Sequence, residues 1–124
     1  MTTRELPTRP ETCCSSPVIP AEMDAITRAD ALTVFKALAD GTRFDVYRLI
    51  AAQDAPICAC DIVDRFDVSQ PTIAHHLKVL REARLITSSR QGIWAYYHVN
   101  PACVDVLRLV VDDLSAKRRD LMTV

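Results

Sequence analysis

A chain of 124 residues has room for one compact domain, and its 49% hydrophobic and 25% charged residues are typical of a folded protein. No apolar run approaches about 18 residues, which excludes a membrane span, and no signal-peptide pattern is present, so we expect a cytoplasmic protein. The formal net charge of −1 neither favours nor excludes nucleic-acid binding, because phosphate contacts need only one basic face.

The beginning of the chain differs in character from the rest. Residues 1–20 are rich in proline and hydroxyl side chains and contain little that could be buried, so they predict a flexible arm. This arm carries Cys13 and Cys14. Residues 21–120 predict a single domain.

Helical patterning begins just after the arm. Apolar residues at helical spacing predict a first helix from about residue 22 to residue 39. Asp40-Gly41-Thr42 interrupts the pattern, and either Asp40 or Thr42 can cap the second helix that follows. Pro56 ends this second helical region, because the residue before a proline disfavours helical dihedral angles. Residues 60–66 predict a third, short helix.

The start of a fourth helix is well marked. Ser69-Gln70-Pro71-Thr72 places a serine at the N-cap and a proline in the first turn, where no backbone donor is needed. Helical spacing continues to about residue 83. The third and fourth helices are separated by a tight turn, so together they predict a helix-turn-helix whose second member is the recognition helix.

Residues that favour β-structure follow the recognition helix. Residues 85–89 and 93–99 flank a turn containing Gly92, which predicts a hairpin. Asn100-Pro101 starts a last helix with an apolar stripe that begins at Cys103. The predicted order is α-α-α-α-β-β-α, a mainly α winged helix-turn-helix in which the hairpin forms the wing.

A polar face of the recognition helix is expected to enter the major groove of DNA. Glutamine pairs in a bidentate manner with adenine, hydroxyl groups reach bases or phosphates, and basic side chains on the helix and the wing contact phosphates. The predicted DNA-binding residues are Ser69, Gln70, Thr72, His75, Lys78, Arg81 and Arg90. The alternative is that this face is only solvated. His76 is expected in the core or in a structural hydrogen bond.

The chain contains five cysteines in an arrangement that does not suit a disulfide framework. Cytosolic thiols stay reduced, and the clusters Cys13-Cys14 and Cys58-Ala59-Cys60 fit the capture of a soft ion or redox sensing. The start of the third helix is expected to favour the thiolate form of the Cys58/Cys60 pair. Alternatively, one of this pair is merely a small buried hydrophobe, and Cys103 is expected to pack in the core.

Several motifs in the same order resemble the ArsR/SmtB family of arsenic- and metal-responsive repressors. They are Leu38-Ala39-Asp40-Gly41-Thr42-Arg43, Ile57-Cys58-Ala59-Cys60-Asp61-Ile62, Ser69-Gln70-Pro71-Thr72-Ile73, His75-His76-Leu77-Lys78-Val79-Leu80-Arg81-Glu82-Ala83, and Arg90-Gln91-Gly92 with Trp94 and Tyr97. The resemblance spans roughly residues 30–100. It implies a homodimer formed through the first and last helices, a double-stranded palindromic operator as partner, and release from DNA when an inducer binds.

Three residues depart from the family's pattern. Gly41 stands where proline is usual at the start of the second helix. Arg84 stands where a glycine usually ends the recognition helix, so we expect Arg84 to adopt the left-handed conformation. Ile93 occupies a wing position that is often basic, so groove recognition is expected to rest on the helix more than on the hairpin.

The pair Cys58 and Cys60 resembles the sensing motif of the arsenite-responsive members, with Val63 where some of them carry a third cysteine. Arsenite and antimonite are soft centres that take three thiolate sulfurs. We expect Cys13, Cys14 and Cys58 to supply them, with Cys60 as the alternative or an accessory ligand, because the end of the arm can span about 25 Å when extended. As(III) or Sb(III) would then be the inducer, with no obligatory cofactor.

Two other regulators of the same fold stay open on the sequence. One responds to cadmium or lead through the same thiolates, and the other to oxidation, through a disulfide from Cys58 or Cys60 to Cys103 or the arm. An enzyme such as a thiol-based arsenate reductase is not expected, because a chain with two glycines offers no loop that could cradle a phosphate. No catalytic residue is therefore predicted.

Overall fold

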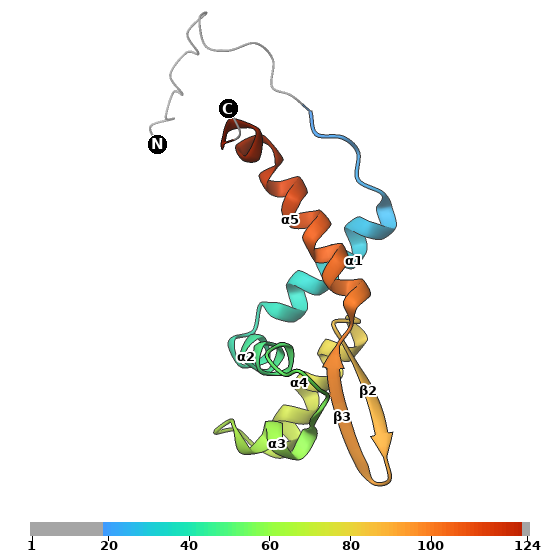
Figure 1. Ribbon diagram of the computed structural model, residues 1–124, viewed down its shortest axis with the longest axis vertical. Helices are drawn as coiled ribbons and strands as arrows, with labels where there is room; N and C mark the ends of the chain where they lie inside the picture. Colours follow the sequence, from blue (N-terminus) through green and yellow to red (C-terminus); the bar gives the residue numbers. More distant parts are fainter. Residues whose placement is uncertain (1–18, 123–124) are drawn as a thin grey trace, which may run out of the picture.

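The computed structural model describes residues 19–122, with side chains as far as Ser115. The elements in chain order are α1 (Ala25–Leu38), α2 (Gly41–Ala51), β1 (Ile57–Cys58), α3 (Ala59–Asp64), α4 (Gln70–Glu82), β2 (Ile86–Gln91), β3 (Trp94–Val99) and α5 (Pro101–Met122). Figure 1 shows α1 and α5 at one end, α2, α3 and α4 toward the other, and the β2–β3 hairpin along one side. The predicted winged helix-turn-helix is confirmed.

Three helices begin where a short polar side chain accepts a hydrogen bond from the first turn. Asp24 Oδ2 accepts from the Thr27 amide at 3.2 Å in α1, and Asp40 Oδ1 accepts from the Arg43 amide at 2.9 Å in α2. Asp40 rather than Thr42 is therefore the cap of α2. Ser69 caps α4 as expected, with Pro71 in its first turn. Such caps typically stabilise a helix by about 1 kcal/mol.

The sheet has three strands where the sequence predicted two. The hairpin of β2 and β3 is present and turns at Gly92, whose φ of 65° suits a residue without a side chain. The additional strand β1 pairs antiparallel with β3, in the order β1-β3-β2, and aligns Cys58 with Tyr96. A two-residue strand has no periodicity of its own, so only its pairing with a distant strand reveals it. This pairing places Cys58 in the same sheet as the wing.

The core lies between the helices and the base of the hairpin. Its most deeply buried large side chains come from α1, α2, α3, α4, the connection after α4 and the start of β2: Val34, Val46, Ile62, Ile73, Leu80, Leu85 and Ile86. Cys103 is also buried, at the edge of this cluster, as expected. The recognition helix α4 is thus held by its inner face, which leaves its outer face free.

Arg84 ends α4 in the left-handed conformation, as the sequence predicted, with a φ of 64°. The Leu85 amide donates to the Leu80 carbonyl at 3.0 Å, which closes the helix end in the manner of a glycine-ended helix. The Asn100 amide side chain donates to the Arg84 carbonyl at 2.9 Å. These bonds hold a conformation that is otherwise unfavourable for a residue with a side chain.

Two helices carry apolar side chains on their outer surface. On α1 these are Ile26, Leu32 and Phe35, and on α5 they are Leu109, Val111 and Leu114, of which Leu114 is 74% exposed. We call these six residues the α1/α5 apolar face. Among the described helices, none combines the length and the apolar character needed to cross a membrane.

Candidate functional site: a DNA-facing helix beside a cysteine-lined cleft

The predicted DNA-binding residues all lie on accessible surface. They are Ser69, Gln70, Thr72, His75, Lys78, Arg81 and Arg90, and all seven are exposed to solvent. By contrast, Ile73, Leu77 and Leu80 of the same helix are buried. The helix therefore has the two faces that the sequence predicted. Arg90 lies on β2, so it offers a cation from the wing.

Some of these polar groups already have partners. The Ser69 hydroxyl caps α4 and also lies 2.8 Å from the Thr72 hydroxyl. Lys78 lies 4.0 Å from Glu82 one turn later, and both side chains are exposed. A surface pair of this kind is worth little, about 0.3–0.5 kcal/mol, so phosphate can compete for the lysine. Gln70 thus remains the side chain in the first turn best suited to contact a base.

Cys58 and Cys60 form a close pair at the junction between β1 and α3. Cys58 is buried, at 6% exposure, and its Sγ accepts a hydrogen bond from the Cys60 amide at 3.4 Å, which makes Cys58 the cap of α3. Cys60 is exposed. The two thiols lie within hydrogen-bonding reach of each other. The alternative that one cysteine of this pair is only a small buried hydrophobe therefore fits Cys58, which is buried. It does not explain Cys60, which is exposed.

The expectation that the start of α3 favours the thiolate does not hold for Cys60. The hydrogen bond with the Cys58 thiol, followed by desolvation, raises the pKa of Cys60 above its usual value. A helix of six residues adds only a weak dipole to oppose this. The raised pKa favours the protonated thiol of Cys60 over its thiolate.

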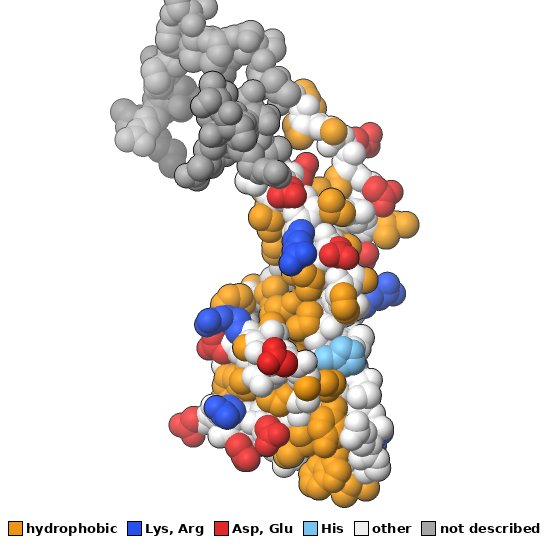
Figure 2. Space-filling model, viewed as in Figure 1, with side chains coloured by type: hydrophobic (Ala, Val, Ile, Leu, Met, Phe, Trp, Pro, Cys, Tyr) orange, Lys and Arg blue, Asp and Glu red, His pale blue; other side chains and the backbone are white. Residues whose placement is uncertain are grey.

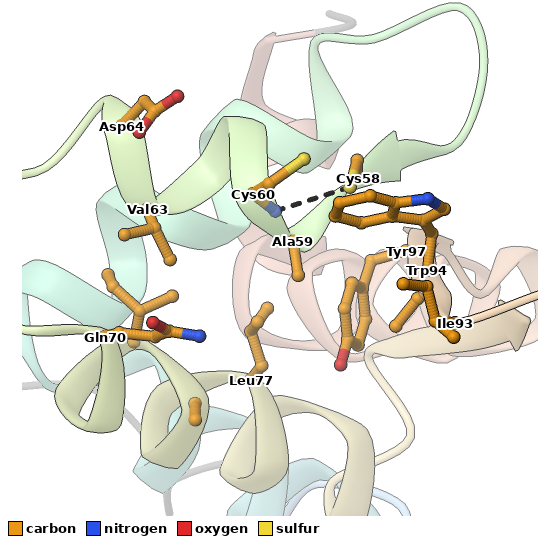
Figure 3. Close-up of a pocket in the computed structure, with 13 residues that line it drawn as sticks. Cys58, Ala59, Cys60, Val63, Asp64, Gln70, Leu77, Ile93, Trp94 and Tyr97 are labelled. Carbon is orange, nitrogen blue, oxygen red and sulfur yellow. Dashed lines mark hydrogen bonds between the residues drawn. The ribbon is translucent and has the colours of Figure 1, made fainter.

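A cleft of about 460 Å³ opens beside the two cysteines. Its walls come from α3, from the inner and N-terminal parts of α4, and from the hairpin, including Gln70, Leu77, Ile93, Trp94 and Tyr97. Figure 3 shows the two sulfur atoms at one end of the cleft, next to the Trp94 indole. Sequence patterns did not reveal this cleft, because its aromatic wall is separated from the cysteines by more than thirty residues of chain.

The remaining cysteines lie elsewhere. Cys103 is buried beside a separate cleft, with Asp30 and Arg84 also on its walls, and burial raises the pKa of its thiol. Cys13 and Cys14 lie outside the described residues. Within residues 19–115, no group of three metal-ligating side chains comes together. The predicted trithiolate site therefore has only Cys58 and Cys60 in the part of the chain that the structure describes.

Comparison with known proteins identifies the family. Residues 40–88 match the family model described as a bacterial regulatory protein of the arsR family. An arsenical resistance operon repressor of Staphylococcus aureus is 36% identical over 73 residues, which is 59% of this chain and 68% of that protein. The chain belongs to the ArsR family of regulatory proteins.

Two further likenesses agree with this assignment. An uncharacterized HTH-type transcriptional regulator of Methanocaldococcus jannaschii is 34% identical over 84 residues, which is 68% of this ArsR-family chain and 93% of that protein. An ArsR-like transcriptional regulator from Rhodococcus sp. RHA1 has the same fold, with a TM-score of 0.65 at 27% identity. The match covers 80% of this chain and 92% of that chain.

A polar network around the buried His76 connects the recognition helix of this ArsR-family chain to α2. His76 is 7% exposed, and its Nδ1 lies 3.3 Å from the Arg43 guanidinium. Arg43 Nε also donates to the Ala37 carbonyl at the end of α1, and His76 Nε2 lies 3.9 Å from Asp40. His76 therefore has the structural role predicted for it. The partners Asp40 and Arg43 were visible in the sequence but could not be paired with it.

This network makes stability depend on pH. Burial lowers the pKa of His76 below its usual 6.5, Arg43 and His75 lower it further, and Asp40 opposes them. The unfolded chain therefore takes up this proton first as the pH falls. The contribution of His76 to stability is full above about pH 6.5 and is lost as the pH falls through its lower, folded-state pKa.

We expect the free energy of unfolding to fall between about pH 7.5 and pH 5, and the variant His76→Gln to flatten that dependence. Urea unfolding at each pH measures the effect. His75→Gln is the matched control, because His75 is an exposed neighbour on the same helix. Equal pH profiles for the wild type and His76→Gln would rule out this role.

Proposed function

We propose that the chain is a homodimeric transcriptional repressor that binds a palindromic operator and leaves it when thiolates capture arsenite or antimonite. The observation that carries this proposal is the position of Cys58. Its sulfur caps the helix directly before the recognition helix, and its backbone pairs with β3 of the wing. A ligand at this sulfur adjoins both elements that would contact DNA.

The DNA-binding part of the proposal is supported by the exposed face of α4. Gln70 and His75 stand near its N-terminal end, and Lys78, Arg81 and Arg90 offer cations to phosphates. A helix-turn-helix dimer places two such helices in successive major grooves, about 34–36 Å apart. The binding site in DNA then has the two-fold symmetry of the protein, which is why we propose a palindromic operator.

The dimer is supported by the α1/α5 apolar face. Apolar side chains as exposed as Leu109, at 65%, and Leu114, at 74%, are costly to leave in water when they cluster. A two-fold dimer buries the same patch from both copies. Figure 1 shows α1 and α5 at one end of the molecule, with the hairpin and α3 toward the other, so a dimer formed there can leave the outer face of both recognition helices free.

The inducer is proposed from the chemistry of the donors. Thiolates select soft ions, and trivalent arsenic or antimony takes three of them. We propose that Cys58 supplies one sulfur and the arm supplies two, from Cys13 and Cys14, with Cys60 as an accessory or alternative ligand. No obligatory cofactor and no catalytic activity are part of this proposal. A cytoplasmic site of action fits the reduced thiols.

Release of DNA follows from strain at the start of α3. Binding of arsenic to Cys58 moves the cap of α3 and the edge of the sheet, and both movements reach α4. Coupling between two sites is typically about 1–3 kcal/mol, so operator affinity is expected to fall about 5- to 150-fold on binding.

A gel shift with and without arsenite tests the proposal. Wild-type protein should release the operator, whereas Cys58→Ser and the double variant Cys13→Ser/Cys14→Ser should bind DNA equally well with and without arsenite. Cys103→Ser is the matched control, since Cys103 lies at a separate cleft, and it should respond like the wild type. Serine is chosen at position 58 because its hydroxyl preserves the cap of α3.

Three outcomes would replace the proposed ligand set or inducer. If both cysteine variants still respond to arsenite, the site lies elsewhere. If peroxide releases DNA and arsenite does not, the chain is a redox-responsive repressor. Release by cadmium or lead alone would identify a soft-metal sensor instead.

A further inference from the structure

The hairpin ends in an apolar side chain that faces water. Ile93 is 84% exposed, which makes it the most exposed large hydrophobic residue in the described part of the chain. Residues 88–91, which lead to it along β2, are polar and also exposed. Figure 2 shows hydrophobic side chains gathered at the end of the molecule where the hairpin turns. The hairpin is therefore a polar strand pair with an apolar tip.

A two-residue turn makes this tip narrow. Gln91 and Trp94 are the last paired residues of the two strands, so Gly92 and Ile93 alone form the turn. Gly92 has a φ of 65° at the first central position, where hairpin turns of type II′ carry glycine. Ile86 at the base of β2 is buried, and a strand rises about 3.3 Å per residue, so the tip lies about 16 Å beyond the core.

The tip lies across a cleft from the start of the recognition helix. Gln70 of α4 lines the cleft on one side and Ile93 on the other (Figure 3). Trp94 is turned toward the cysteines within this cleft, so Ile93 forms the point of the hairpin. In the proposed complex α4 occupies the major groove. The groove next to it, which the hairpin meets, is the minor groove.

We propose that Ile93 is an apolar wedge that enters the minor groove beside each half-site and selects DNA that bends easily there. The inference rests on the proposed DNA binding, and it adds to the recognition helix a second element that reads the shape of DNA. The minor groove is about 6 Å wide, which is too narrow for a pair of strands but admits a single side chain at a tight turn.

Isoleucine reads DNA differently from a polar or charged side chain. It offers no donor to the acceptors on the floor of the minor groove, so it cannot distinguish bases by hydrogen bonds. Apolar side chains that enter this groove partly unstack two base pairs and kink the duplex. The cost depends on sequence, because pyrimidine–purine steps are flexible and A-tracts are stiff. The expected preference is therefore for a TA or CA step outside each half-site.

A cation near the tip supports DNA as the occupant. Arg90 is exposed on β2, two residues before the turn begins. From there its guanidinium can contact the phosphates that border the minor groove, while Ile93 enters between them. An apolar protein surface would offer no counterpart for this charge. The hairpin thus continues the DNA-binding surface that α4 begins.

Selection of binding sites from a random library of DNA duplexes tests the inference, and it needs no known operator. The wild type should enrich a palindrome flanked at a fixed distance by a pyrimidine–purine step. Ile93→Ala should enrich the same palindrome without that step, and Ile93→Arg should enrich an A-tract there, because a narrow minor groove attracts arginine. Ile19→Ala is the matched control, because Ile19 is 83% exposed and lies outside the hairpin, and it should retain the step.

Affinity and bending, measured on the duplex that the wild type enriches, separate a wedge from a phosphate contact. Ile93→Ala should weaken binding about tenfold and reduce the bend reported by energy transfer between dyes at the duplex ends, with the salt dependence unchanged. Arg90→Ala should also weaken binding, but it should lower the slope of the salt dependence by about one. Circular dichroism of each variant verifies that it is folded.

The outcomes separate this inference from the proposed function. If Ile93→Ala retains the flanking step, or if the wild type enriches a palindrome without one, the inference is wrong and the proposed DNA binding stands. If the wild type enriches no palindrome, both fail. Equal effects of Ile19→Ala and Ile93→Ala would also overturn the inference, because loss of any exposed isoleucine would then suffice.

Discussion

The double variant Leu109→Asp/Leu114→Asp is expected to be a monomer and to bind operator DNA about 100-fold or more weakly than the wild type. Both side chains belong to the α1/α5 apolar face and are 65% and 74% exposed in the single chain, so the substitutions remove little packing within one copy. In a two-fold dimer formed through this face the aspartates would be buried in the interface of both copies, and unpaired buried charges are strongly unfavourable.

The loss of DNA affinity follows from the loss of avidity. When two recognition helices are joined in one dimer, the second half-site is bound at a high effective concentration, which raises affinity by about 10²–10⁴. Sedimentation equilibrium measures the oligomeric state, and a gel shift measures the affinity. Phe44→Asp is the control, because Phe44 is an exposed apolar residue of α2, outside the α1/α5 apolar face. A double variant that remains dimeric would place the interface elsewhere.

The variant Leu80→Ala is expected to lower the free energy of unfolding by about 2–5 kcal/mol. Leu80 is fully buried on the inner face of the recognition helix, and its carbonyl closes the left-handed end at Arg84. The truncation leaves a cavity in the core, in addition to the loss of buried apolar surface.

Urea unfolding measures this change. Lys78→Ala on the outer face of the same helix should change stability by less than about 0.5 kcal/mol, because it removes only an exposed pair with Glu82. A change of less than about 1 kcal/mol for Leu80→Ala would mean that the core collapses around the missing side chain or that α4 is less tightly packed than its burial indicates.

The parts of the fold that local chemistry specifies were predictable from the sequence. Ser69 and Pro71 mark the start of α4, Gly92 marks the hairpin turn, and the Arg84 conformation follows from the need to end a helix where no glycine stands. Each of these features is determined by a few neighbouring residues. The two-faced character of α4 was predictable for the same reason, since helical spacing assigns each side chain to a face.

The parts that depend on distant residues were not predictable. Strand β1 exists because β3 pairs with it, and the sequence around Ile57 shows no alternation that would reveal it. The bond between Arg43 and His76 joins residues 33 positions apart. The pKa of Cys60 depends on the orientation of the Cys58 thiol, which the helix-dipole argument ignored. Cys13 and Cys14 lie outside the described residues, so the ligand set from the arm stays a prediction.

The pairing of β1 with β3 also determines where the chain tolerates a change in length. Residues 52–56 form a connection on the surface between α2 and β1, and an extra residue there leaves the alignment of Cys58 with Tyr96 intact. An extra residue within β1 itself is different, because successive strand residues face opposite sides of a sheet. Cys58 could then keep its role as the cap of α3 or its alignment with Tyr96, but not both. Relatives that differ in length should therefore carry their insertions before this strand and not within it.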